Sequence, residues 1–262
     1  MIARAGAGLA LALAIALAAW RAGALSASGA VAATVVGTLA AAAGWEWAAL
    51  LIAYFVSATA LSRLGEARKA RRTARVVAKG GRRDAVQVLA NGGVFAGAAA
   101  LSLVAPWPGW AAVGVGSLSA AAADTWGTEL GTLVGSAPRL VTTGRRVPPG
   151  TSGAVTAPGM AATVAGALFT GGAAWMLGWP REIVGAAAAG GFAGALADSL
   201  VGATLQARRR CDRCAADTEQ PVHACGAPTR HAGGVAWLEN DLVNVVCAFV
   251  GGATALLWTS WR

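Results

Sequence analysis

Eight long apolar stretches, almost free of charged residues, constrain the fold of this chain more than any other feature of its sequence. A membrane-spanning helix needs about 20 mainly apolar residues, and each stretch is close to that length. Because 56% of the 262 residues are hydrophobic and only 13% are charged, the chain exceeds what a soluble core would bury. The sequence therefore predicts an all-α, polytopic membrane protein, a single membrane domain over residues 1–262. Its transmembrane helices are expected at about 2–20, 26–44, 46–62, 85–105, 109–126, 158–178, 182–205 and 238–258.

The eleven tryptophans support these boundaries, because indole rings favour the headgroup level of a bilayer. Every tryptophan lies at a predicted span end or within a few residues of one. The aromatic pattern and the apolar pattern therefore predict the same set of spans.

The distribution of positive charge predicts the orientation. The loop 63–84 carries nine Lys and Arg residues, a load that stays on the cytoplasmic side. The N-terminus is then outside, and eighteen of the 21 cations fall on the inner side. A cleaved signal peptide over residues 1–24 is the alternative, but it would move the basic loop outside. We expect a plasma-membrane protein with a cytoplasmic active face, whose net charge of +9 indicates topology and contact with anionic lipid, not nucleic acid binding.

Acidic residues are scarce, and five of them lie at the cytoplasmic ends of predicted spans. An ionised carboxylate is costly in hydrocarbon, so such residues normally face a polar cavity. Asn residues at the same depth add neutral oxygen ligands. The acids are Asp124, Glu129, Asp198, Glu239 and Asp241, and the amides are Asn91, Asn240 and Asn244.

A short repeat links two of these spans. Ala-Asp124-Thr125 and Ala-Asp198-Ser199 each end a span that runs inward. Two parallel helices with this ending would present two carboxylates to one site, which suggests a duplication.

The cytoplasmic loop 127–157 contains a segment rich in Gly, Pro and Thr. Arg145 and Arg146 precede Pro149-Gly150-Thr151-Ser152-Gly153, which is too rich in helix breakers to begin a regular span. Backbone N–H groups, hydroxyls and arginines near several carboxylates are what a magnesium–phosphate site requires. We therefore expect Asp124, Asp198 and Asp241 to bind Mg²⁺ beside this loop. The segment is not a P-loop, and a solvated basic turn is the alternative.

Five motifs in order resemble those of an integral membrane family that includes animal transmembrane protein nineteen and the phytyl-phosphate kinases of plants and cyanobacteria. The resemblance covers most of the chain from about Lys79 onward. The motifs are Lys79-Gly-Gly-Arg82-Arg83 to Asn91, Ala-Asp124-Thr-Trp-Gly-Thr-Glu129, Pro149-Gly-Thr-Ser-Gly153, Ala-Asp198-Ser-Leu-Val-Gly-Ala-Thr-Leu-Gln206 and Leu-Glu-Asn240-Asp241-Leu-Val-Asn244.

The resemblance implies a Mg-dependent phosphotransferase. A nucleoside triphosphate, with CTP expected, would phosphorylate a prenyl monophosphate such as phytyl or geranylgeranyl phosphate. Asp124, Glu129, Asp198 and Asp241 are then the expected catalytic residues. The expected binding residues are Lys79, Arg82, Arg83, Asn91, Thr125, Arg145, Arg146, Gly150, Thr151, Ser152, Gly153, Ser199, Gln206, Asn240 and Asn244.

A transporter or scramblase of a phosphorylated lipid is the alternative function, with the same acids and arginines binding a headgroup. A transporter should carry polar residues to the outer face. The outer halves of the last five spans are mostly Ala, Gly, Val, Leu and Trp. This composition favours an enzyme that is open on one side.

The cytoplasmic loop 207–236 carries a separate cluster of potential ligands. Cys211 and Cys214 are followed by His223 and Cys225. In a reducing compartment this pattern predicts a structural Cys3His zinc site, with His231 as an alternative fourth ligand. Unligated loop thiols are the other reading.

Overall fold

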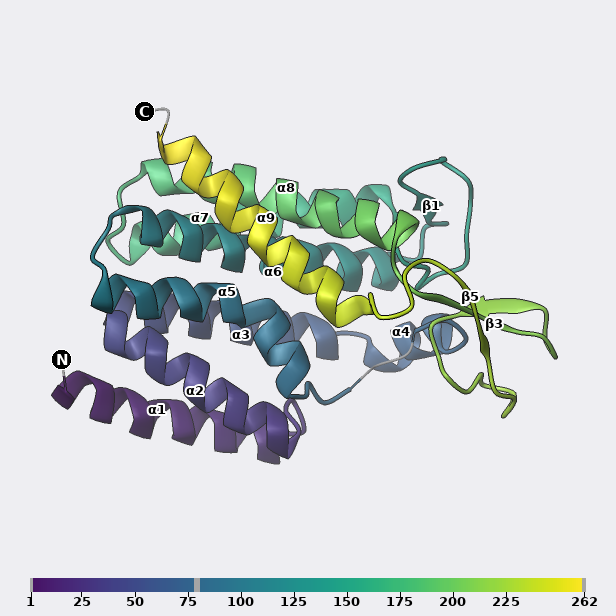
Figure 1. The fold of residues 1–262 in the computed structure, drawn as a ribbon, viewed down its shortest axis with the longest axis horizontal. Helices are drawn as coiled ribbons and strands as arrows, with labels where there is room; N and C mark the ends of the chain where they lie inside the picture. The colour runs from purple at the N-terminus through teal and green to yellow at the C-terminus, as the bar shows by residue number, and fades with distance from the viewer. Residues whose placement is uncertain (1, 78–80, 261–262) are drawn as a thin grey trace.

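The computed structural model describes residues 2–77 and 81–260. Over these ranges the chain forms nine helices and two small antiparallel sheets (Figure 1). The helices are α1 (Ile2–Arg21), α2 (Ala27–Ala43), α3 (Trp45–Arg63), α4 (Glu66–Thr73), α5 (Ala85–Val104), α6 (Gly109–Val134), α7 (Ala157–Met176), α8 (Glu182–Thr204) and α9 (Asn240–Ser260). The strands are β1 (Arg139–Leu140), β2 (Ala154–Val155), β3 (Arg208–Cys211), β4 (Ala216–Thr218) and β5 (Arg230–Gly233).

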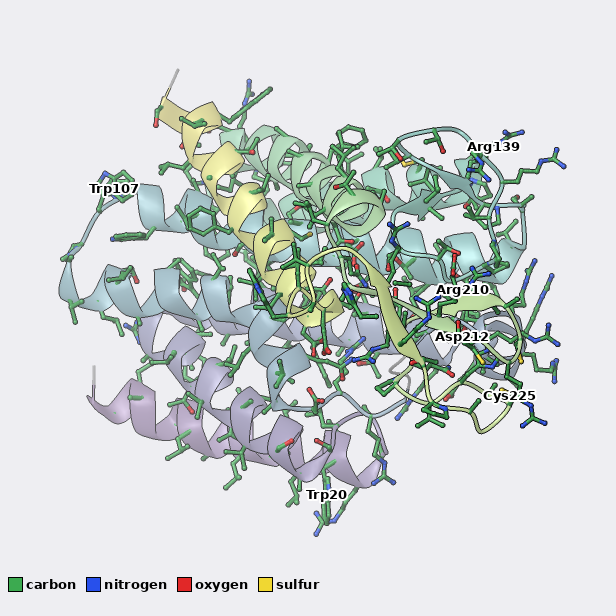
Figure 2. All side chains as sticks on the ribbon, turned by 45° about the vertical axis from the view of Figure 1, so that its right-hand side comes forward. Trp20, Trp107, Arg139, Arg210, Asp212 and Cys225 are labelled. Carbon is green, nitrogen blue, oxygen red and sulfur yellow. The ribbon has the colours of Figure 1, made fainter. Side chains whose placement is uncertain are left out.

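The eight long helices form one bundle with α6 near its centre. α6 contacts α3, α5, α7, α8 and α9, whereas α1 and α2 form a hairpin at the edge that meets α5 and α3. The chain termini lie at one end of the bundle, and α4 and both sheets lie at the other (Figure 1). Figure 2 shows Arg139, Arg210 and Asp212 at this sheet end and Trp107 at the opposite end. The architecture confirms the all-α prediction and gathers the basic loops at one end.

Five helices of the described chain are long and apolar enough to cross a membrane: α1, α3, α5, α8 and α9. The apolar helix α2 is shorter, at 17 residues. All eight long helices coincide with the stretches expected from the sequence, and most helix ends agree to within a few residues. The count of eight spans and the outside N-terminus stay predictions.

Polar side chains fix the starts of several helices at the sheet end. The Ser26 hydroxyl accepts from Gly29 N at 3.1 Å, and Thr156 does the same for Gly159 N. At α5, Asp84 accepts from Gln87 N at 2.9 Å while Gln87 accepts from Asp84 N at 3.1 Å. Such reciprocal bonds satisfy two donors that a helix start leaves without a partner.

Small residues let α6, α8 and α9 approach closely. A Cβ atom placed on Gly251 would lie 2.7 Å from Gly116 O and 3.1 Å from Gly190 O. Each of these atoms belongs to the backbone of a neighbouring helix, so no side-chain movement could relieve the contact. The glycines therefore set the spacing of the three helices that carry the predicted aspartates.

The bundle end opposite the sheets is filled by a packed aromatic and aliphatic core. Trp47 is only 5% exposed, and its ring centroid lies 5.2 Å from that of Phe95 and 5.8 Å from that of Trp179. Val115, Leu118 and Ile183 belong to the same cluster. Trp47 therefore packs inside the bundle, whereas its neighbour Trp45 is exposed as expected of an interfacial residue.

The three loops that were expected on the cytoplasmic side contain more regular structure than the sequence predicts. α6 continues to Val134, eight residues beyond the predicted span end, and stops at Gly135, which adopts a left-handed φ of +87°. The basic loop 63–84 contains α4, and loop 207–236 forms a sheet with strand order β4-β3-β5. The Gly/Pro loop between α6 and α7 is a hairpin in which β1 pairs with β2.

Candidate functional site

A cavity of about 600 Å³ opens at the sheet end of the bundle, between α6, α8 and α9 and the β1–β2 hairpin. Polar residues from segments far apart in the sequence meet on its walls. They include Asp124, Thr128, Thr163, Asp198, Ser199, Gln206, Arg209, Glu219, Glu239, Asn240, Asp241 and Asn244, with the whole segment Pro149–Gly153. Most of the predicted site residues therefore share one cavity.

Three aspartates approach this cavity from three helices. Asp124 lies on α6, Asp198 on α8 and Asp241 in the first turn of α9. Oδ2 of Asp198 is buried and has no hydrogen-bond partner among the described residues. A buried carboxylate oxygen without a donor suits a cation ligand, because its charge is otherwise uncompensated.

The repeat found in the sequence corresponds to equivalent places in the bundle. α6 and α8 run in the same direction, so Asp124 and Asp198 reach the cavity at the same end. Ser199 also lines the cavity, whereas the lining residues do not include Thr125. The two helices thus place equivalent aspartates at the cavity, but only α8 also contributes the hydroxyl residue that follows its aspartate.

The Gly/Ser/Thr segment forms one wall of the cavity. Gly150 and Gly153 have φ values of +88° and +71°, which L side chains rarely adopt. A Cβ on Gly153 would collide with the backbone of α8 at Ser199 and Ala203. The hydroxyls are engaged within the protein, since Thr151 donates to Pro148 O at 2.8 Å and Ser152 donates to Glu219 Oε1. The expected phosphate donors of this loop thus already have protein partners through their hydroxyls.

The arginines that line the cavity differ from those expected. Arg145 and Arg146 are exposed on the hairpin, outside the cavity lining. Arg72 and Arg209 line it instead. Arg72 donates to Thr132 O at 3.1 Å and to Gly135 O at 2.8 Å, so it caps the end of α6, while Arg209 has no ion pair with a described residue.

Glu129 lies away from the cavity, against the expectation of a catalytic role. It forms an ion pair with buried Lys69, and the Ser62 hydroxyl donates to its Oε1 at 2.7 Å. Glu129 lies five positions after Asp124, so its side chain points about 140° away from that of Asp124 around the helix axis. The structure therefore gives Glu129 a place in the contact between α4 and α6.

Two other expected residues line a second cavity. Arg83 and Asn91 border an apolar cavity between α1, α2, α3 and α5. Arg83 donates to Thr59 Oγ1 at 3.3 Å and to Ser62 Oγ at 3.2 Å. Arg82 is exposed, and Lys79 lies outside the described residues.

Sequence reasoning missed several residues of the main cavity. Glu219 lies in loop 207–236, outside the acids that the sequence singled out, yet it accepts from Gln206 Nε2 at 3.0 Å and from the Ser152 hydroxyl. Gln87, one turn into α5, lines both cavities. Gln87 could have been recognised as a polar residue near the depth of Asn91. Glu219 reaches the cavity only because the β4-β3-β5 sheet packs against the segment after α4.

Among the described residues, the Cys/His set is the one group of three or more possible ligands whose ligand atoms all lie within 4.8 Å of one another. It lies outside the cavity lining, on the sheet. The three aspartates do not form such a preassembled group. Mg²⁺ is usually bound by one or two carboxylates together with phosphate oxygens and water, so the aspartates fit that ion only when a phosphate ligand is present.

Hydrogen bonding polarises the Cys/His set. A hydrogen bond with His223 is the main cause that lowers the pKa of Cys225 to about 6. A hydrogen bond with Cys225 is the main cause that raises the pKa of Cys214 to about 11. The thiols of Cys214 and Cys225 therefore differ in acidity because of their hydrogen bonds within the set.

Comparison with known proteins identifies the family. The family of integral membrane protein DUF92 matches residues 10–252. The chain belongs to this family. This membership confirms the resemblance seen in the five motifs and the membrane class of the fold.

Proteins with similar sequences occur in plants and archaea. Protein PGR of Arabidopsis thaliana is 32% identical over 251 residues, covering 85% of this chain and 84% of that protein. An uncharacterized membrane protein of Methanocaldococcus jannaschii is 33% identical over 216 residues, with coverage of 82% and 76%. Protein VTE6, chloroplastic, of Arabidopsis thaliana is 30% identical over 243 residues, with coverage of 89% and 65%. No solved structure matches the chain significantly.

Proposed function

We propose that this protein is a prenyl-phosphate kinase. It transfers the γ-phosphate of a nucleoside triphosphate, CTP by the family resemblance, to an isoprenoid monophosphate at the cytoplasmic face of the cell membrane. One observation carries the proposal: a polar cavity lined by three aspartates adjoins an apolar cavity, and both are lined by Gln87. A substrate with a phosphate head and a hydrocarbon tail matches this pair of cavities.

The second cavity supports the tail assignment. It measures about 100 Å³, room for only the part of an isoprenoid tail next to the phosphate, and is bordered mostly by Ala, Gly, Val, Leu and Ile from four helices. Its polar lining residues are Tyr54, Arg83, Gln87 and Asn91. An isoprenoid chain placed between these helices would leave its phosphate near Gln87, at the border of the polar cavity.

The reaction requires positioning and charge neutralisation more than proton transfer. An oxygen of the prenyl phosphate attacks the γ-phosphorus, the bond to the β-phosphate oxygen breaks, and the products are a prenyl diphosphate and a nucleoside diphosphate. The attacking phosphate is already an anion at neutral pH, so no general base is needed. Mg²⁺ held by Asp124, Asp198 and Asp241 would offset the charge on the transferring phosphates.

The residues of the chain supply the rest of the chemistry. Arg209 lines the cavity without an ion pair to a described residue, which supports a role in binding a phosphate oxygen. The Pro149–Gly153 wall, packed against α8, limits the space for water beside the phosphates. In-line geometry then depends on how the hairpin and α8 hold the two phosphates.

The packed far end of the bundle disfavours the transporter alternative. Trp47, Phe95 and Ile183 form part of a buried core at the end opposite the cavity, and the partly buried Trp179 packs against it. A transporter would need a polar path through this core. The cavity instead is lined by residues from the sheet end.

The direct test is label transfer. Purified protein in detergent or nanodiscs is incubated with Mg²⁺, γ-labelled CTP or ATP, and phytyl, geranylgeranyl or shorter prenyl monophosphates. Label in the lipid fraction as prenyl diphosphate is the expected result. Absence of transfer from every nucleotide, together with binding of prenyl phosphate, would replace the proposal with the transporter.

The tail assignment has its own test in two adjacent glycines of α5. Gly92 is buried and lines the apolar cavity, whereas a Cβ on Gly93 meets nothing within 4 Å. Gly92→Leu should therefore reduce kcat/KM for a twenty-carbon acceptor about tenfold or more and spare a five-carbon acceptor. Gly93→Leu is the matched control, since both changes remove a helical glycine. Equal effects of the two variants would contradict the tail path.

A further inference from the structure

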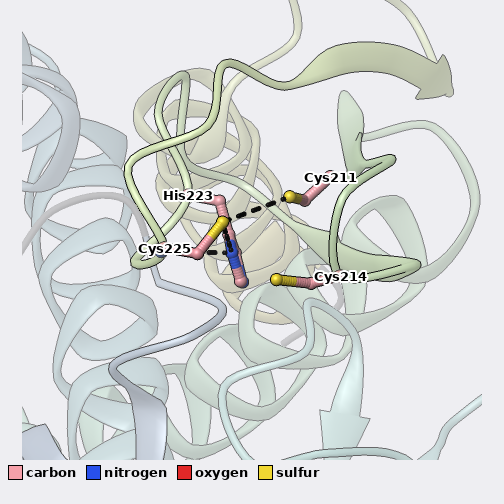
Figure 3. A group of neighbouring side chains, drawn as sticks. All are labelled: Cys211, Cys214, His223 and Cys225. Atoms are coloured by element: carbon pink, nitrogen blue, oxygen red, sulfur yellow. Dashed lines mark hydrogen bonds between the residues drawn. The ribbon is translucent and has the colours of Figure 1, made fainter.

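Two tight turns bring four metal-ligating side chains together on the small sheet (Figure 3). Cys211 ends β3, and Cys214 follows in the turn toward β4. His223 and Cys225 lie in a second turn, closed by hydrogen bonds from His223 N to Ala227 O at 2.9 Å and from Gly226 N to His223 O at 2.8 Å. The ligand atoms of all four converge to within 4.8 Å of one another.

The separations suit a tetrahedral ion and not a disulfide. Cys211 Sγ lies 3.7 Å from Cys225 Sγ, and His223 Nδ1 lies 3.2 Å from Cys225 Sγ. A disulfide would require about 2.05 Å between sulfurs. Sulfurs bound at about 2.3 Å to one tetrahedral zinc lie about 3.8 Å apart, close to the observed value.

The sheet has few other means of holding its shape. Its strands are three or four residues long, and only two of their eleven residues, Cys211 and Thr218, are buried. The buried residues include Cys211 and His223, whose Nε2 is buried without a partner among the described residues. Units of this size that lack an apolar core usually depend on a disulfide or a metal.

His231, the alternative fourth ligand, is not part of the group. It pairs across the sheet with Arg209 and is exposed. The four positions around the ligand centre are filled by Cys211, Cys214, His223 and Cys225, which leaves no open coordination position for a substrate.

The same sheet supplies part of the polar cavity. Glu219 follows β4 directly, and its N donates to Val76 O at 2.9 Å. Gln220 Nε2 donates to Ala74 O at 2.9 Å and to Val77 O at 2.8 Å. Through these bonds the sheet holds the basic segment after α4 and places Glu219 beside Gln206 and Ser152.

We infer that Cys211, Cys214, His223 and Cys225 bind one Zn²⁺, a closed structural site that folds the β4-β3-β5 sheet and so builds the wall of the cavity that contains Arg209 and Glu219. The inference does not depend on the reaction, because any ligand of the cavity would meet the same wall.

The test measures metal and structure in the full-length protein. Protein purified without chelator should contain about one zinc per chain by elemental mass spectrometry. Cys225→Ser should lower the zinc content about tenfold or more, because a zinc site that loses a thiolate binds far more weakly. Cys247→Ser is the matched control, since Cys247 is buried in α9 away from the sheet and should leave the zinc content unchanged.

A second measurement uses the wild-type protein, so it does not depend on whether the Cys225→Ser variant folds. Chelation of the wild-type protein should expose the sheet to trypsin at Arg208, Arg210 and Arg213, and added Zn²⁺ should restore resistance. Substitution with Co²⁺ should give the visible absorption of a tetrahedral thiolate site. A wild-type protein with less than about 0.1 zinc per chain that also binds no added Zn²⁺, or a Cys225→Ser protein that keeps its zinc, would overturn the assignment.

Discussion

Replacing Asp198 by Asn should lower the catalytic rate without lowering the stability of the fold. Asp198 Oδ2 is buried without a hydrogen-bond partner among the described residues, and the negative charges of Asp124 and Glu219 act on it. Asn keeps the shape of the side chain but removes the charge. If Asp198 binds Mg²⁺ during phosphoryl transfer, the charge that the transition state requires is lost.

The expected loss in kcat is at least about 10²-fold, which corresponds to about 2.7 kcal/mol of transition-state stabilisation. The folded state should not be destabilised, because a neutral amide costs less to bury than an unpaired carboxylate near two other acids. The midpoint of thermal unfolding should therefore stay the same or rise.

Both quantities are measured on the same preparation. Label transfer from nucleotide to prenyl phosphate gives kcat at saturating substrates, and thermal unfolding in detergent gives the midpoint. Asp217→Asn is the matched control, because Asp217 is an exposed residue of β4 that pairs with Arg210 at 3.1 Å. A folded Asp198→Asn protein with near wild-type kcat would refute the metal-ligand reasoning, and a large drop in the midpoint would refute the account of the buried charge.

Three further perturbations test other parts of the structure. Arg209→Ala should raise the nucleotide KM about tenfold, the effect of losing a charge-assisted contact of ~1.5–3 kcal/mol. Arg208 lies outside the cavity lining, so Arg208→Ala should leave the KM unchanged. If the two variants had the same nucleotide KM, Arg209 would not belong to the site. Gly251→Leu should lower the stability of the bundle by about 1–3 kcal/mol in unfolding experiments, because backbone atoms of two helices occupy the space of its side chain, and an unchanged stability would contradict that packing. A cysteine placed at Ala74 should resist an impermeant thiol reagent in intact cells whereas one at Pro180 should react, and the reverse pattern would overturn the predicted orientation.

The sequence predicted the long helices well because the membrane imposes their length and polarity. A span must satisfy its backbone internally and avoid charge, so its position follows from composition over about 20 residues. The same reasoning placed Asp124, Asp198 and Asp241 at one depth, and the structure brings them to one cavity. Depth along a helix is readable from sequence.

Direction around a helix is also readable from sequence, and it separates Glu129 from Asp124. Gly127, Thr128 and Gly131 lie within a narrow angle of Asp124 on α6 and line the cavity, while Glu129 points to Lys69. The roles of Glu219 and Arg209 could not be found this way. Both depend on strand pairing over loop 207–236, where short strands, turns and four close ligands leave no apolar period to follow.

The packed core around Trp47 and Phe95 limits how a bound lipid can move between the two leaflets of the membrane. With the far half of the bundle filled, a lipid that reaches the cavity from the adjacent leaflet must return to that leaflet, and its charged headgroup then keeps it there. If the product is a prenyl diphosphate, whichever protein consumes it must work on the same membrane surface, where the two can meet by lateral diffusion in two dimensions.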